Sequence, residues 1–164
     1  KHEEVHGEEE WQPHIKLGLS VLIPETYVQD LDLRLGLYRR AGKLESENEI
    51  EEFAVELIDR FGAMPDEVQH YLTTLKLKLL CKTTGIERLD VGPKGMVLTF
   101  YQNKVARPEG LVDFLSNPAN KAKLRNDQKL VIQFIQPDLE KKIAYIRKVL
   151  SSLSHYLLKE MKAA

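Results

Sequence analysis

The stretch Ile86–Tyr101, "IERLDVGPKGMVLTFY", decides the fold class of this 164-residue chain. Two β-type runs flank the turn residues Gly92–Gly95, and Met96, Leu98 and Phe100 occupy alternate positions of the second run. A period of two on either side of a Gly/Pro turn is typical of a β-hairpin. The sequence therefore predicts that the chain changes from helix to strand at about Gly85.

Before this hairpin the apolar residues recur mainly at helical intervals. The spacing predicts helices from Asp30 to about Gly42, from Ser46 to Gly62, and from Pro65 toward Gly85. Ser46 and Glu49 form an S-x-x-E capping box, in which the Glu side chain is expected to reach back to the Ser46 amide. Upstream of the helices, alternation predicts a half-buried strand that ends at Pro24; its inward positions are Ile15, Leu17, Leu19 and Val21.

After the hairpin, the prolines Pro108 and Pro118 bound a short predicted helix, and a second hairpin is expected to turn near Asn126 and Asp127. A long amphipathic helix then enters through Pro137, with an apolar stripe of Leu139, Ile143, Ile146, Leu150, Leu153 and Leu157. The predicted fold class is α+β: a helical first half, then ββαββ hairpins and a long C-terminal amphipathic helix. Residues 1–12 are expected to be an acidic linker or tail, and residues 13–164 a single α+β domain.

Composition limits the classes of protein to which this chain can belong. The net charge is −1 and 43% of the residues are hydrophobic, which is typical of a globular protein whose binding to a polyanion would have to be local. The single Cys81 excludes an internal disulfide and fits a reducing, cytoplasmic compartment. No run of apolar residues is long enough for a membrane span, so no membrane partner is expected. Because the chain starts without Met, we expect a fragment of a longer protein.

No group of residues predicts an active site. Gly92–Gly95 contains Lys94 but is followed by a strand, so it lacks the helix that a phosphate loop requires. His2 and His6 have metal-ligand spacing but fall in the expected linker. We therefore expect no catalytic residue, no bound cofactor and no metal. Two basic sets on predicted helices leave nucleic-acid contact open as an alternative to a solvated face: Arg34, Arg39 and Arg40, and Lys141, Lys142, Arg147 and Lys148.

The segment Glu51–Asp66, "EEFAVELIDRFGAMPD", carries two stripes on one predicted helix. The core stripe consists of Ile50, Phe53, Ala54, Leu57 and Phe61, and the opposite stripe of Glu52, Glu56 and Asp59. An acidic stripe of this kind is usually only solvated, and Glu56 is spaced to pair with Arg60 four residues later.

Short sequence motifs identify a protein family more specifically than the spacing of apolar residues does. "VELIDRFG", the following Pro65-Asp66, and "GI" before the first hairpin resemble the C-terminal (TRCF) domain of bacterial transcription-repair coupling factors, and the likeness extends from about Ile15 to Gln136. The resemblance implies a regulatory module of a DNA repair protein that couples transcription to repair. In that family the parent protein is an ATP-driven DNA translocase that removes RNA polymerase and recruits UvrA, with its ATPase motifs in other domains.

The resemblance also implies a function for the acidic stripe. In the family this domain is a non-catalytic, autoinhibitory module that docks on the UvrB-like N-terminal domain of the same chain and masks its UvrA-binding surface. The matching docking residues here are Glu56 and Asp59. The alternative function is an accessory nucleic-acid-contacting domain of the DNA translocase. In both cases RNA polymerase and UvrA would be indirect partners, and DNA would be reached through the parent protein.

Overall fold

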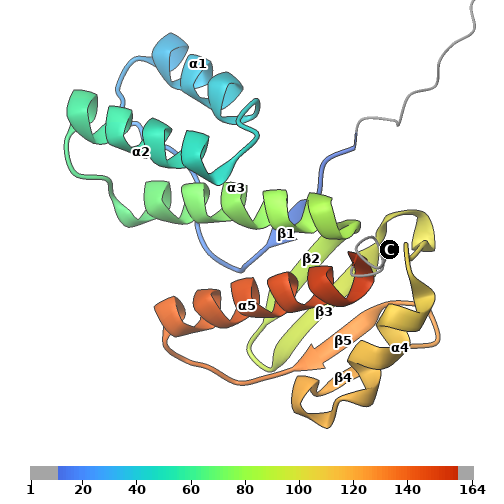
Figure 1. Cartoon of the computed structure of the whole chain (residues 1–164). Coiled ribbons are helices and arrows are strands. Elements are labelled where there is room, and N and C mark those ends of the chain that lie inside the picture. Colours follow the sequence, from blue (N-terminus) through green and yellow to red (C-terminus); the bar gives the residue numbers. More distant parts are fainter. Residues whose placement is uncertain (1–10, 159–164) are drawn as a thin grey trace, which may run out of the picture.

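The computed structural model describes residues 11–158, and the α+β fold class predicted from the sequence is confirmed. The first strand of a five-stranded sheet precedes three helices, the other four strands follow them, and a long C-terminal helix comes last (Figure 1). The strands lie in the order β1-β2-β3-β5-β4. Their bounds are His14–Lys16 for β1, Ile86–Gly92 for β2, Gly95–Phe100 for β3, Ala122–Leu124 for β4 and Leu130–Gln133 for β5.

The helical half consists of α1 (Leu31–Ala41), α2 (Glu47–Phe61) and α3 (Asp66–Thr84). Figure 1 shows α1 and α2 stacked beyond α3, away from the sheet. The first half of α3 buries Val68 and Leu72 in a core shared with α1 and α2, whereas its second half buries Leu77 and Cys81 in the sheet core. α3 therefore joins the two cores and fixes the position of α2 relative to the sheet.

The sheet half contains the hairpin β2–β3, which turns at the predicted Gly92–Gly95, and the hairpin β4–β5. Between them lies α4 (Pro108–Ser116), with short 3-10 turns at Tyr101–Asn103 and Pro118–Asn120. Helix α5 (Leu139–Leu158) lies across the sheet, packed against α3 and α4 (Figure 1). Four of its six predicted stripe residues are fully buried, namely Ile146, Leu150, Leu153 and Leu157.

The first strand is shorter than predicted. β1 ends at Lys16, because Gly18 has a positive φ of 74° and turns the chain away from the sheet. Leu17 and Leu19 are still half-buried, whereas Val21 is exposed, so the expectation of one continuous strand as far as Pro24 is wrong. β1 pairs in parallel with β2, with Ile15 opposite Leu89, and the three helices between them form the crossover.

The start of α2 has the predicted cap, with one difference. Ser46 Oγ accepts a hydrogen bond from the Glu49 amide at 3.1 Å. Glu49 Oε1 accepts from the amide of Glu45 at 2.7 Å and does not reach back to Ser46 as predicted. Both bonds satisfy amides at a helix start that has no intrahelical partners, so α2 begins at a defined residue.

Residues 1–10 of the expected linker lie outside the described part of the chain. Trp11, in the last part of that linker, is half-buried and stacks on Tyr101 with ring centroids 4.3 Å apart. The Lys82 ammonium lies 4.5 Å from the centroid of the Trp11 ring and donates to the Trp11 carbonyl. The chain therefore meets the domain at the C-terminal end of α3.

Candidate functional site

Helix α2 presents one buried face and one exposed face. Ile50, Phe53 and Leu57 are at most 2% exposed, as the core stripe predicts, and Ala54 and Phe61 are half-buried. Two ion pairs anchor α2 to α3 and α5: Glu51 bonds Lys76 of α3, and Glu47 bonds Arg147 of α5 at 2.7 Å. The opposite face is thus held in a fixed orientation toward solvent.

Glu56, the first of the two predicted docking residues, is engaged inside the domain. Its carboxylate accepts two hydrogen bonds from Arg40 of α1, at 2.6 and 2.8 Å, and a third from Arg60 at 2.8 Å. Arg40 also lies over the Phe53 ring, 5.3 Å from its centroid. The Arg60 pair was foreseen from the i,i+4 spacing, but the Arg40 pair was not. Glu56 therefore links α1 to α2 and is only one-third exposed.

The hydrogen bonds from Arg40 and Arg60 lower the pKa of Glu56 to about 2, from an ordinary value of 4.5. A lowered pKa means that the folded state favours the carboxylate, so its contribution to stability is complete above about pH 4.5 and is lost as the pH falls toward 2. Because Arg40 and Arg60 are exposed, the contribution of Glu56 to the free energy of unfolding is about 1 kcal/mol. We expect Glu56→Gln to lower the melting temperature at pH 7 and to melt like the wild type near pH 2. A melting difference that stays constant from pH 7 to pH 2 would contradict this assignment.

Asp59, the second predicted docking residue, differs from Glu56. It is exposed on the same helix, and no ion pair joins it to any residue from 11 to 158. Glu52 is likewise exposed, without an ion pair in that range. Asp59 and Glu52 are therefore the acids of α2 that are available to a partner, while Glu56 already has two cations beside it.

Two exposed apolar side chains on α2 were missed by the sequence analysis. Val55 is 65% exposed and Ile58 is 48% exposed, and they lie three residues apart on the helix surface, to one side of Glu52 and Asp59. The signal was present in the helical wheel, because positions 55 and 58 both fall outside the core stripe. We use the term α2 docking face for the exposed surface formed by Glu52, Val55, Ile58 and Asp59, bordered by Glu56.

Four of the seven basic helix residues singled out from the sequence, among them Arg40, are engaged in internal contacts. Arg34 donates to the backbone carbonyls of Val28 and Gln29 and so closes the start of α1. Lys142 donates to the Gly92 carbonyl at 3.1 Å, and Arg147 forms the ion pair with Glu47 described above. These side chains stabilise the fold, whereas Arg39, Lys141 and Lys148 are exposed and form no ion pair with another residue in the range 11–158.

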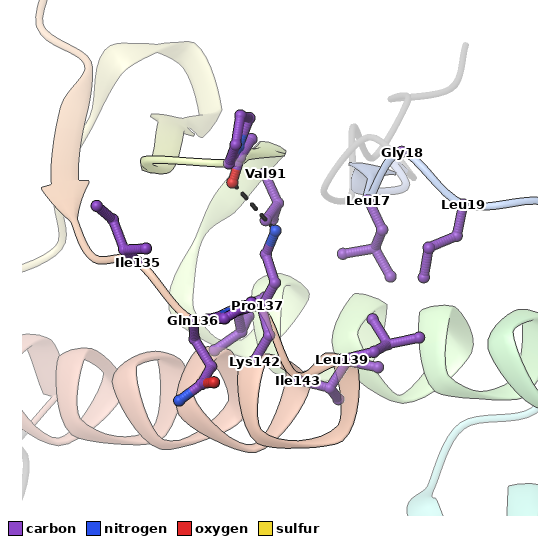
Figure 2. Close-up of a pocket in the computed structure, with 13 residues that line it drawn as sticks. Leu17, Gly18, Leu19, Val91, Ile135, Gln136, Pro137, Leu139, Lys142 and Ile143 are labelled. Atoms are coloured by element: carbon purple, nitrogen blue, oxygen red, sulfur yellow. Dashed lines mark hydrogen bonds between the residues drawn. The ribbon is translucent and has the colours of Figure 1, made fainter.

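An apolar groove lies between the start of α5 and the β2–β3 turn, with a volume of about 610 Å³. Figure 2 shows Leu17 and Leu19 directed toward Leu139 at the start of α5, with Lys142 reaching the turn by its hydrogen bond to the Gly92 carbonyl. Ile135 borders the groove and is 75% exposed. The two predicted stripe residues of α5 that are not fully buried, Leu139 and Ile143, line this groove.

Residues 11–158 include no cluster placed to hold a metal ion and no reactive cysteine. Within that range no three His, Cys, Asp or Glu side chains are placed to hold a metal ion, and His2 and His6 lie outside it. Cys81 is fully buried, and burial raises the pKa of its thiol to about 12, so it is not a reactive thiolate. None of the helices in the same range is long and apolar enough to cross a bilayer.

Comparison with known proteins gives consistent results. Residues 17–111 match the family model described as the TRCF domain. The chain is 46% identical over 131 residues to the transcription-repair-coupling factor of Rickettsia bellii, covering 80% of this chain and 12% of that protein. For the transcription-repair-coupling factor of Escherichia coli K12 the identity is 32% over 144 residues, covering 87% and 12%. The chain therefore spans about 12% of the length of these relatives.

A solved structure supports the fold. The crystal structure of the C-terminal domain of transcription-repair coupling factor superimposes with a TM-score of 0.73 at 20% sequence identity. The superposition covers 91% of this chain and 96% of the solved one. At this level of identity the likeness establishes the arrangement of helices and strands only, and the α2 docking face depends on the residues of this chain.

Proposed function

This chain belongs to the TRCF domain family of transcription-repair-coupling factors, and on that premise we propose that it is a non-catalytic, autoinhibitory domain. It docks through the α2 docking face on the UvrB-like N-terminal domain of the same protein and masks the surface that binds UvrA. The role in transcription-coupled repair is a property of the family. Docking through the α2 docking face and masking of the UvrA-binding surface are what we propose for this chain.

The observation that carries the proposal is the combination of free acids and exposed aliphatic side chains on one rigid helix. Asp59 has no ion-pair partner within residues 11–158, and it lies near Val55 and Ile58, which are about half exposed or more. An apolar centre with charged residues around it is the usual anatomy of a protein interface. The complementary surface is expected to supply Arg or Lys for the acids and an apolar side chain for Val55 and Ile58.

A weak interface is sufficient for a domain of this kind. Within one chain the effective concentration of the domain near its docking surface is of the order of 1 mM, so a Kd of about 10 μM keeps the closed form favoured by roughly 100 to 1. A contact this weak can be displaced by a tighter ligand of the masked surface. We propose UvrA as that ligand, with RNA polymerase engaged by other parts of the protein.

The alternative, nucleic-acid contact through the basic helix faces, has less support. Arg40 is bonded to Glu56, Arg147 to Glu47 and Lys142 to a backbone carbonyl, so these cations are already committed inside the domain.

The proposal is tested by titrating this domain in trans against the isolated UvrB-like domain by calorimetry. We expect a Kd of about 10 μM, since the interface is small and its ion pairs are exposed. Saturating UvrA should abolish the binding, because both ligands need the same surface. No heat of binding at 100 μM of each domain, or a Kd unchanged by UvrA, would contradict the proposal.

A further inference from the structure

The sheet has one covered face and one open face. Helices α3, α4 and α5 pack on the face that buries Leu89, Leu98 and Ile132. The strand register places the other set of side chains on the opposite face, where Asp90 pairs with Val97 and Val97 with Val131. Lys16 stands beside Asp90 at one end of this row, and Lys123 stands beside Val131 at the other. We call this surface the open sheet face.

The open sheet face carries four exposed lysines, which are Lys16, Lys94, Lys121 and Lys123. None of them forms an ion pair with another residue in the described range 11–158. Asp90 is the carboxylate in the central row, and Arg88 holds it at 2.8 Å. Lys94 and Lys121 line the same hollow beside Gln133. The face is thus strongly positive, with its one acid already neutralised.

This local charge contrasts with the rest of the domain. Residues 85–158 contain 12 Lys and Arg against 7 Asp and Glu, a net charge of +5, while residues 11–84 contain 9 against 12, a net charge of −3. The net charge of the domain is therefore small because an acidic first segment and a basic second segment offset each other. The acidic side contains the α2 docking face, and the basic side contains the open sheet face.

The residue types on the open sheet face indicate which kind of ligand it binds. The described strand residues place no Phe, Tyr or Trp on it. Phe134 lines the hollow beside Lys94 and Lys121, but it packs against Tyr145 with ring centroids 4.6 Å apart. Successive bases of a single strand would therefore find no row of rings to stack on. Lys16 and Lys123 stand at opposite edges of five strands, about 19 Å apart at the usual strand spacing of about 4.8 Å. A duplex presents rigid rows of phosphates on that scale, with about one charge per 1.7 Å of axis. We propose that the open sheet face binds the phosphate backbone of duplex DNA, without reading its sequence, through Lys16, Lys94, Lys121 and Lys123.

This inference does not rest on the docking proposal, because it uses another surface. Docking through α2 does not involve the sheet residues. The docking proposal and the DNA-binding proposal can therefore be contradicted independently of each other. It also places the nucleic-acid contact on the sheet, where the cations are unpaired, and not on the helices, where most of them are engaged.

The test is fluorescence anisotropy of a labelled 20-base-pair duplex of mixed sequence, titrated with the domain at 50 and 200 mM salt. Four phosphate contacts predict a slope of about −3.6 in log K against log salt, which is a loss of about 100-fold in affinity between the two concentrations. Lys16→Gln with Lys123→Gln should weaken binding at 50 mM and reduce the slope by about 2. The matched control, Lys43→Gln with Lys148→Gln, removes two exposed lysines outside the face and should leave the slope unchanged.

Three results would overturn the proposal. The first is no binding at 50 mM salt by a protein whose circular dichroism is that of the folded domain. The second is an equal loss of slope in the sheet variant and in the control, which would mean a diffuse charge effect. The third is a preference for another ligand. Tighter binding to a single-stranded 20-mer would assign the face to a single strand, and competition by poly-glutamate as effective as that by unlabelled duplex would assign it to an acidic protein.

Discussion

Replacing Ile146 by Asp is expected to unfold the domain. Ile146 is 1% exposed and lies in the core that α5 shares with the sheet. Removing a buried Ile side chain costs about 2 to 5 kcal/mol, and a buried carboxylate without a partner adds several more. A domain of this size is stable by only about 5 to 15 kcal/mol. Thermal melting followed by circular dichroism should show no cooperative transition, or one at a much lower temperature.

Ala144→Asp is the matched control for this prediction, because Ala144 is exposed on the same helix two residues earlier. Its melting temperature should change little, since an exposed substitution usually shifts stability by less than about 0.5 kcal/mol. Ile146→Ala gives a graded version of the test if the Asp variant cannot be purified. A wild-type melting curve for Ile146→Asp would show that α5 is not part of the core in solution.

Much of the fold could be predicted because it depends on neighbours in the sequence. The stripe of α5 follows from spacings of three and four, and the buried residues Ile146 and Leu150 lie where that spacing places them. The hairpin at Gly92–Gly95 follows from its turn residues, and the cap at Ser46 from the residue three positions later. In each case the information lies within one turn or one hairpin.

The parts that were missed depend on residues far apart in the chain. The pairing of Ile15 with Leu89 spans the whole helical half, and no local pattern indicates a parallel neighbour for β1. The pairing of Glu56 with Arg40 joins two helices 16 residues apart, whereas its pairing with Arg60 was predictable from one helical turn. For the same reason, the availability of Asp59 and the engagement of Glu56 could be separated only in the folded structure.

Reversing the charge of both predicted docking acids is expected to open the domain in the full-length protein. Exposed ion pairs contribute about 0 to 1 kcal/mol each when lost, and a like charge in their place costs more. Glu56→Lys with Asp59→Lys can then total about 2.8 kcal/mol, a factor of roughly 100, which would bring a 100-to-1 closed form close to balance. UvrA should bind the double variant more tightly, by up to about 100-fold, in a surface-binding titration against the wild type.

The structure requires the two substitutions to be separated, because they act on different contacts. Lys at position 56 would face Arg40 and Arg60, so Glu56→Lys should also lower stability by about 1 kcal/mol, or roughly 2 to 4 °C in Tm. Asp59→Lys breaks no ion pair within residues 11–158 and should keep the wild-type Tm while still increasing UvrA binding, by about tenfold.

Asp113→Lys is the matched control for charge, since it reverses an exposed acid on α4. It should leave both UvrA binding and Tm unchanged, because α4 is not part of the α2 docking face. If Asp59→Lys binds UvrA like the wild type while deletion of the whole domain strengthens the binding, the closing contacts lie elsewhere on this domain. If only Glu56→Lys strengthens UvrA binding, and in proportion to its loss of Tm, opening results from loosening α1 against α2 and not from a broken docking contact.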